Sequence, residues 1–200
     1  LLLSNYYQKI KIFTRNSINI QHSKLEVYQI NFNDLDNESD KITGDDCFFC
    51  IGTTRKQTPI KKNYIDIEFN LPTKIAKITK KNNVKSFIYV SSGGANPESK
   101  NLYLKNKGMA EENIINLKFN FTAIIQPSLL LGSRKEFRIG ERIAQFIFKN
   151  LSFIFIGKLK PFKAIKSEIV AKAIVKIIKD SKKDIYFSSE KLEYLGNLDN

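Results

Sequence analysis

Hydrophobic and polar positions alternate along this chain with two periods, and the order of these periods predicts its architecture. Short apolar runs rich in β-branched and aromatic residues are typical of buried strands, and apolar residues repeating every three or four positions indicate amphipathic helices. The pattern predicts strands over residues 9–14, 24–30, 47–51, 87–90, 121–126 and 184–188. It predicts helices over residues 33–43, 63–81, 103–117, 136–149 and 167–179, the second interrupted near Pro72. No clear periodicity follows Ser189.

Strand and helix alternate through most of this order, which is typical of α/β proteins. We therefore expect a doubly wound parallel sheet with helices on both faces and right-handed connections. Two hundred residues are enough for one domain with a sizeable core, so residues 1–200 are expected to form a single domain.

Charge and hydropathy narrow the classes of function. The net charge is +13, from 33 basic and 20 acidic residues. A basic chain suggests nucleic-acid binding, but the basic residues are mostly lysines spread along the chain, whereas base and phosphate recognition relies on arginine. We expect a lysine-rich surface that attracts anionic ligands. No apolar run reaches the roughly eighteen residues that a membrane span needs.

Cys47 and Cys50 form a C-x-x-C pair within a strand-like run. Positions three apart on a strand point to opposite faces, which disfavours a disulfide or a shared metal. Buried structural cysteines are therefore expected, and no metal site. With two cysteines and no signal-peptide pattern, the chain is expected to be cytoplasmic.

The stretch after the strand at 87–90 carries the candidate chemistry. The strand ends at Ser91 and Ser92, and Tyr103 and Lys107 follow four residues apart in a predicted helix. Residues four apart share a helical face, and a nearby ammonium lowers the pKa of a phenol. The pattern therefore predicts a proton-transfer site, with Ser92 as the first choice and Ser91 as the second for the hydroxyl partner. The alternative is a surface tyrosine and lysine without chemistry.

This set resembles the Ser/Tyr/Lys set of the short-chain dehydrogenase/reductase superfamily. Further pieces follow the order of an atypical branch, the Tat-interacting-protein-like reductases and their bacterial NAD(P)-binding relatives. The resemblance runs from about residue 9 to about residue 179 and implies a Rossmann-like domain. It assigns Tyr103 as the acid/base residue, and Lys107 as the group that lowers the tyrosine pKa and holds the ribose. The further pieces are C-I-G-T-T-R from Cys50, Y-L-x-x-K-G-x-x-E from Tyr103 and P-S-L-L-L-G-x-R from Pro127.

The same resemblance assigns cofactor contacts at two strand ends. The turn of Gly52, Thr53 and Thr54 lies along the cofactor in this family, and a glycine lets the backbone approach a ligand closely. Pro127 and Ser128 lie near the nicotinamide. A plain turn and simple strand termination are the alternatives.

Arg15 ends the first predicted strand, where the family places a basic residue that contacts the 2′-phosphate of NADP. Relatives that prefer NAD tend to carry an acidic residue there, and residues 14–17 contain none. The resemblance therefore implies NADP, with NAD as the alternative for the cofactor and a solvated arginine as the alternative for Arg15. Arg134, Arg138 and Arg142 are expected to pair with neighbouring glutamates rather than to bind an anionic substrate.

A dinucleotide fold opens with a strand and a glycine-rich turn that holds the pyrophosphate. The first of the nine glycines here is Gly44, and residues 1–7 resemble the end of a helix. We expect that the opening strand and turn are missing, so that the sheet lacks a central strand and the dinucleotide binds poorly. Adding roughly 15–25 upstream residues should rescue binding. The alternative is a protein that naturally lacks the phosphate turn.

Together these features predict an NAD(P)-dependent oxidoreductase that transfers a hydride to or from a small carbonyl or alcohol, or a related epimerase or dehydratase. The alternative is a non-catalytic NADP-binding sensor or scaffold on the same fold. Nothing in the sequence identifies the substrate.

Overall fold

The computed structural model describes residues 1–131, 164–180 and 184–198. The predicted helix at 136–149 lies outside these residues. The strands are β1 (Ile10–Thr14), β2 (Leu25–Gln29), β3 (Asp46–Phe49), β4 (Ser86–Val90), β5 (Phe121–Gln126), β6 (Leu130–Leu131), β7 (Ile165–Lys166) and β8 (Tyr186–Ser188). The longer helices are α2 (Lys61–Ile65), α3 (Leu71–Lys81), α4 (Leu102–Asn116), α6 (Ser167–Lys179) and α7 (Ser189–Asn197). Shorter segments are α1 (Leu35–Glu38), a 3₁₀ turn (Ser39–Lys41) and a π segment (Asp66–Asn70).

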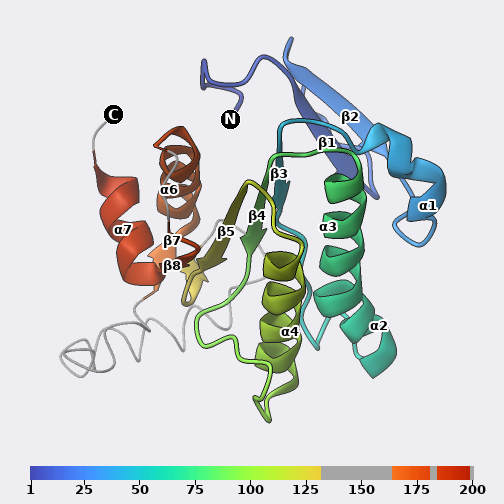
Figure 1. Ribbon diagram of the computed structural model, residues 1–200, viewed down its shortest axis with the longest axis vertical. Helices are drawn as coiled ribbons and strands as arrows, with labels where there is room; N and C mark the ends of the chain where they lie inside the picture. The colour runs from blue at the N-terminus through green and yellow to red at the C-terminus, as the bar shows by residue number, and fades with distance from the viewer. Residues whose placement is uncertain (132–163, 181–183, 199–200) are drawn as a thin grey trace.

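A parallel sheet in the order β3-β4-β5-β8 forms the centre of the molecule. Helices α2, α3 and α4 lie on one side of it, and α6 and α7 lie on the other (Figure 1). The prediction of a doubly wound, Rossmann-like α/β fold is confirmed.

Side chains of the central strands alternate between two cores, which is why helices cover both faces. Phe87 and Tyr89 of β4 pack with α3 and α4, whereas Ile88 packs with α6 and α7. On β5, Ile124 joins the first core and Ile125 the second. All five side chains are buried, as expected for a strand with a neighbour on each side and a helix over each face.

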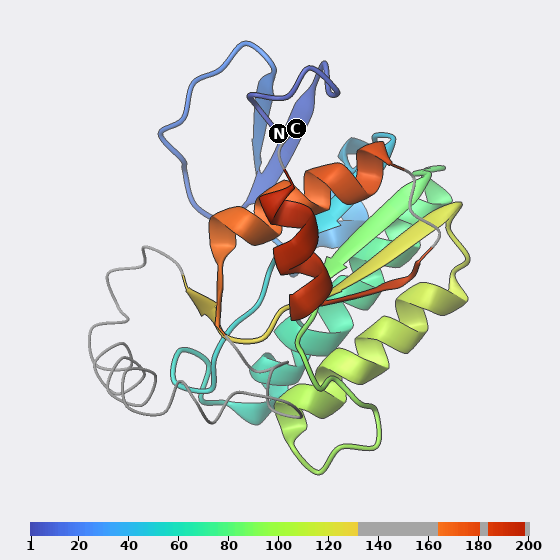
Figure 2. The ribbon, with the colours of Figure 1, turned by 90° about the vertical axis from the view of Figure 1, so that its left-hand side faces the viewer.

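Strands β1 and β2 form a separate parallel pair, drawn in blue above the main sheet in Figure 2. No described strand bridges β1 and β3. Side-chain hydrogen bonds connect the regions, among them those from Lys11 Nζ to Thr43 Oγ1 at 2.7 Å and from Tyr7 Oη to Asp46 Oδ2 at 2.7 Å. The expected helix end over residues 1–7 is wrong, since this segment forms turns. A turn hydrogen bond from Ser4 N to the oxygen of Leu1, at 2.9 Å, forms there in place of helical bonds.

The helix predicted over residues 63–81 was expected to be interrupted near Pro72. The irregular part of the helix lies just before this proline and is a π segment instead of a break. The helix runs from Lys61 to Lys81 but widens into the π segment just before the proline, which occupies the first turn of α3. Proline has no N–H to donate into the preceding turn, and the wider π segment accommodates this missing bond. The π segment turns Glu68, an acidic residue among apolar neighbours, into the protein, where it is 1% exposed.

The segment after Ser189 was expected to lack periodicity, but it forms α7. Leu192 and Leu195 are buried against α6, and a side chain at Gly196 would place its Cβ 2.3 Å from the backbone oxygen of Ile169. The helix is therefore stabilised by a close backbone contact, which a hydrophobic pattern does not reveal.

Candidate active site

The candidate site lies beyond the carboxyl ends of β3, β4 and β5, where ligands bind in parallel α/β sheets. Backbone hydrogen bonds hold the loops together: Ser91 N donates to the oxygen of Ile125 at 2.7 Å, and Gly93 N donates to that of Pro127 at 2.8 Å. The predicted residues at the ends of β4 and β5 therefore meet at one edge of the sheet.

Helix α4 presents Tyr103 and Lys107 to this edge. Asn101 caps the helix, because its Oδ1 accepts hydrogen bonds from the backbone N–H groups of Tyr103 at 2.9 Å and of Leu104 at 3.3 Å. A Cβ at Gly108 would lie 2.4 Å from the backbone nitrogen of Pro97. Because residue 108 is a glycine, the loop that begins with the two serines can pack directly against the helix.

Lys107 is buried, at 4% exposure, and its Nζ lies among polar and aromatic groups. Nζ is 3.1 Å from Glu68 Oε2 and donates a hydrogen bond to the oxygen of Val90 at 3.3 Å. It also lies 4.9 Å from the ring centre of Tyr89 and 5.9 Å from that of Tyr103. The structure thus brings Lys107 next to the tyrosine, as the spacing predicted, but pairs it with a carboxylate.

Tyr103 is half-buried and lies near Ser92, whose hydroxyl donates to the backbone oxygen of Gly93 at 3.3 Å. Burial raises the pKa of Tyr103; the nearby Ser92 hydroxyl lowers this pKa, and the Glu68 carboxylate raises it. The expectation of a lowered pKa is therefore wrong for this arrangement. The physical reason is first that burial penalises the charged phenolate, and second that the Glu68 carboxylate also raises the pKa of Tyr103.

The two candidate serines have different environments. Ser92 is the one beside Tyr103, whereas Ser91 is buried and donates its hydroxyl hydrogen to Glu111 Oε1. Gln126 Nε2 also donates to both oxygens of Glu111, at 3.0 and 3.1 Å. Burial raises the pKa of Glu111, and these hydrogen bonds partly oppose the rise. The structure therefore places Ser91 in a buried network one helical turn beyond Lys107.

Hydrogen bonds within the turn after β3, and one to Glu68, hold this turn in place. The backbone N–H of Thr53 donates to Glu68 Oε1 at 2.5 Å, and Thr53 Oγ1 lies 2.8 Å from Thr58 Oγ1. Thr54 Oγ1 accepts a hydrogen bond from the backbone of Gln57 at 3.2 Å. A Cβ at position 52 would lie 3.4 Å from Glu68 Oε1, so Gly52 packs against the same carboxylate.

Glu68 is thus a residue of the candidate site that sequence reasoning missed, and it connects the turn at Gly52 to Lys107. The available signal was one acidic residue in an apolar stretch, with Ile67 and Phe69 as neighbours. That signal is weak, because the direction of the side chain depends on the π segment.

Pro127 and Ser128 are fixed from the other side of the sheet. Pro127 is buried. The backbone N–H of Ser128 donates to Ser189 Oγ at 2.6 Å, and Ser189 Oγ donates to Ser128 Oγ at 2.9 Å. The end of β5 is therefore attached to the start of α7.

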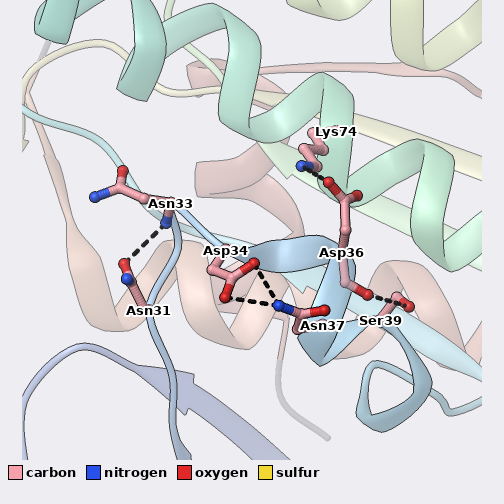
Figure 3. Close-up of polar contacts among 7 residues, drawn as sticks. All are labelled: Asn31, Asn33, Asp34, Asp36, Asn37, Ser39 and Lys74. Atoms are coloured by element: carbon pink, nitrogen blue, oxygen red, sulfur yellow. Dashed lines mark hydrogen bonds and ion pairs between the residues drawn. The ribbon is translucent and has the colours of Figure 1, made fainter.

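Arg15 is exposed beyond β1, beside the end of β2, and its backbone oxygen accepts a hydrogen bond from Gln29 Nε2 at 3.1 Å. The loop after β2 is rich in polar contacts that the sequence did not indicate, and Figure 3 shows them. They join Asn33 N to Asn31 Oδ1 at 3.0 Å, Asn37 Nδ2 to both oxygens of Asp34 at 2.9 Å, and Lys74 Nζ to Asp36 Oδ2 at 2.8 Å.

Cys47 and Cys50 are both free thiols. Cys50 was expected to be buried but is exposed. It lies just past the end of β3, and β3 borders the break in the sheet. Within the described ranges, no group of three or more His, Cys, Asp or Glu residues is arranged to hold a metal ion. Arg134, Arg138 and Arg142 lie outside the described residues. None of the described helices is both long and apolar enough to cross a membrane.

Known proteins of similar sequence identify the family of this chain. The profile of a family described as NAD(P)H-binding matches residues 1–181. The mitochondrial protein FMP52 of Candida albicans is 38% identical over 129 residues, which are 64% of this chain and 56% of that protein. Protein HTATIP2 of Rattus norvegicus is 29% identical over 155 residues, covering 74% of this chain and 64% of that protein. The chain thus spans little more than half the length of these curated relatives.

Among solved structures, the Bordetella bronchiseptica enzyme WbmH in complex with NAD⁺ superposes with a TM-score of 0.63. The superposition covers 90% of this chain and 66% of that one at 14% identity, a level at which only the fold is shared.

The comparison corrects one expectation. A cytoplasmic location is wrong, because the FMP52 relatives of this chain are named as mitochondrial proteins. A low cysteine count cannot distinguish the cytoplasm from the mitochondrion, because it reflects the redox conditions around a protein and not its location in the cell. Because the family profile matches most of the chain, the chain belongs to the NAD(P)H-binding family; its similarity to HTATIP2 and its fold agree with the resemblance to the atypical short-chain dehydrogenases/reductases.

Proposed function

We propose that this protein is an oxidoreductase that reduces a small carbonyl compound with NADPH. The observation that carries the proposal is the position of Tyr103, which lies near the Ser92 hydroxyl and 5.9 Å, measured at its ring centre, from the Lys107 ammonium. Such a reaction needs three groups: a proton donor, a hydroxyl that can hold the substrate oxygen, and a cation that can hold the ribose.

The described residues fit the nicotinamide and ribose half of a dinucleotide. Gly52 leaves no side chain at the end of β3, and the buried Lys107 ammonium reaches the same edge of the sheet. The strand ends also bring the loop of Ser92 next to Pro127. The described residues show no glycine-rich phosphate turn, so the pyrophosphate half remains a prediction.

When bound, a reduced dinucleotide would supply a hydride, which is two electrons and a proton, to the carbonyl carbon of the substrate. Tyr103 then donates its hydroxyl proton to the carbonyl oxygen, and Ser92 holds that oxygen during the transfer. Solvent returns a proton to the phenolate, so the products are an alcohol and the oxidised dinucleotide. Lys107, whose Nζ lies 5.9 Å from the ring centre of Tyr103, is the cation that would hold the ribose.

Replacement of Tyr103 by phenylalanine tests this proposal. With NADPH and a panel of aldehydes and ketones, Tyr103→Phe should lower kcat by about 10²-fold or more, the effect of losing a positioned proton donor. Its Kd for NADPH, measured by fluorescence, should change little, because the ring stays in place. Tyr194→Phe, at a tyrosine that is 66% exposed, is the matched control and should keep full activity. Full activity in Tyr103→Phe would reject the proposal.

A non-catalytic NADP-binding sensor is the second candidate. The favouring observation is the ion pair of Lys107 with Glu68, which leaves Tyr103 without a net positive neighbour. Such a protein would bind NADPH yet transfer no hydride to any member of the panel, and Tyr103→Phe would then change neither property.

We also propose that the protein acts in mitochondria, as the names of its FMP52 relatives suggest. Fractionation of cells that express the untagged protein tests this: it should sediment with mitochondrial markers, and recovery in the cytosolic fraction would contradict it.

A further inference from the structure

Glu68 is a buried carboxylate whose contacts join three parts of the site. It lies on the π segment, and its Oε1 accepts the backbone N–H of Thr53 from the turn after β3. Its Oε2 is 3.1 Å from Lys107 Nζ on α4 and has no aligned hydrogen bond from any described donor. Both side chains are almost fully buried, at 1% and 5% exposure.

Burying the Glu68–Lys107 pair costs free energy, because both charges lose their contact with water. A buried ion pair seldom stabilises a fold more than apolar residues of the same volume would. Its retention beneath Tyr103 therefore points to a role in the site. The lysine has little freedom to move, because the carboxylate and the oxygen of Val90 hold its ammonium in one place.

The groups that face Tyr103 and Lys107 come from every element packed around them. Glu68 lies on the π segment, Tyr64 on α2 and Tyr89 on β4, and Ser92 follows β4. On α4 itself, Glu111 lies one turn beyond Lys107, and Cys50 after β3 also senses the lysine charge. Glu68 is the only carboxylate in this described set that both contacts the ammonium and acts on Tyr103.

We propose that Glu68 is a positioning residue that fixes Lys107 and, by balancing its charge, keeps Tyr103 in the proton-donating phenol form. A tyrosine in that form suits carbonyl reduction, in which it gives up a proton. Alcohol oxidation needs the phenolate as a base, so the pair biases the site toward reduction. This direction of catalysis rests on the function proposed above, whereas the charge balance at Tyr103 does not.

The charge balance is tested without cofactor or substrate. Protein labelled with ¹³Cζ-tyrosine is titrated between pH 8 and 11 by NMR, and Tyr103→Phe assigns the signal. In Glu68→Gln the phenolate fraction of Tyr103 at a fixed pH should rise about tenfold, as for one unbalanced opposite charge within ~4–6 Å. Glu68→Asp keeps the charge and should titrate close to the parent protein. Glu111→Gln, which neutralises the other buried carboxylate of this region, should leave the Tyr103 signal unchanged.

Glutamine keeps an oxygen for the Thr53 amide, but the unpaired Lys107 could prevent folding. A second pair of variants covers that outcome. Lys107→Met should move the Tyr103 titration to higher pH, and adding Glu68→Gln to it should bring the titration back, since both charges are then gone. An unmoved Tyr103 signal in Glu68→Gln, or in Lys107→Met, would overturn the inference.

Kinetics then separate the inference from the proposed function. If both hold, Glu68→Gln shifts the pH profile of alcohol oxidation to lower pH and raises the ratio of oxidation to reduction at pH 7. If the NMR titration moves but no variant transfers hydride, the charge balance stands and the oxidoreductase proposal fails. If reduction depends on Tyr103 but its titration ignores Glu68, the oxidoreductase proposal stands and this inference fails.

Discussion

At the scale of single residues, two buried carboxylates organise the candidate site. Glu68 contacts Lys107, and Glu111 accepts hydrogen bonds from Ser91 and Gln126. A charge removed from water needs partners in the protein, so each carboxylate determines the positions of the groups around it.

The Glu68–Lys107 pair should show strong coupling in unfolding experiments. Each single replacement, Glu68→Gln or Lys107→Met, leaves one buried charge unpaired and should lower the free energy of unfolding by about 3–5 kcal/mol. The double variant should lose far less than the sum of the two. Urea unfolding measures the cycle.

The exposed pair of Lys85 and Asp45, with nitrogen and oxygen 2.8 Å apart, is the control for that cycle. Its coupling should stay below about 1 kcal/mol, since solvent screens it. Additive losses at Glu68 and Lys107 would show that the buried charges do not interact.

Glu111 makes a different prediction, because burial raises its pKa above the value in the unfolded chain. The folded protein therefore holds that proton more tightly, and this contribution to stability is complete below the unfolded pKa of about 4.3. It is lost as pH rises from there through the folded pKa. Glu111→Gln has no such proton, so its unfolding free energy relative to the parent should increase as pH rises from 4 to 8.

Chemical unfolding at several pH values measures that difference. Glu190→Gln, on an exposed glutamate of α7, is the control and should show no comparable trend. A relative stability of Glu111→Gln that falls with pH would contradict the predicted sign.

At the scale of elements, α4 matters because two features fix its position. Asn101 caps its first turn, and Gly108 lets the loop at Asn96 and Pro97 pack against its side. Together they place Tyr103 opposite Ser92 with little room for adjustment.

Gly108→Ala should therefore destabilise the protein although it improves helix propensity. On an exposed helix the change would stabilise by about 1 kcal/mol. Here the new methyl meets backbone atoms 2.4 and 2.5 Å away, so we expect a loss of about 1–3 kcal/mol and a lower kcat. Thermal unfolding and carbonyl reduction measure the two effects, and Asn113→Ala on the same helix is a control for propensity. A more stable Gly108→Ala variant would contradict the packing argument.

At the scale of the whole molecule, binding a dinucleotide would span two sheets. Arg15 belongs to the β1-β2 pair, whereas Tyr103 and Lys107 lie over the four-stranded sheet.

Arg15 gives the test of cofactor choice at this scale. We predict tighter binding of NADPH than of NADH, and about a tenfold loss of that preference, about 1.4 kcal/mol, in Arg15→Ala. The preference should also weaken with salt, because a net charge of +13 attracts the more anionic cofactor. Lys56→Ala, on an exposed residue of another loop, controls for general charge. Equal affinities in the unmutated protein would contradict the proposal.

Much of this protein could be predicted from local sequence patterns. The period of apolar residues located most strands and the helices around Tyr103 and Ile174 close to their observed bounds, because side-chain direction repeats with backbone geometry. The four-residue spacing placed Tyr103 and Lys107 on one helical face for the same reason. The strand-end serines indicated the direction of the site, but the spacing could not separate Ser91 from Ser92.

Only the tertiary structure decided what surrounds these residues. Glu68 reaches Lys107 because a π segment rotates it inward, and α7 forms because Gly196 meets the backbone of α6. The pKa of Tyr103 rises where the sequence predicted a fall, because the fold buries the phenol and brings close to it a carboxylate from 35 positions earlier in the chain. A local hydrophobic pattern reveals strands and helices because it follows the repeat of the backbone. Charge balance and close packing depend on contacts between segments that are far apart in the chain, and a local pattern does not reveal these contacts.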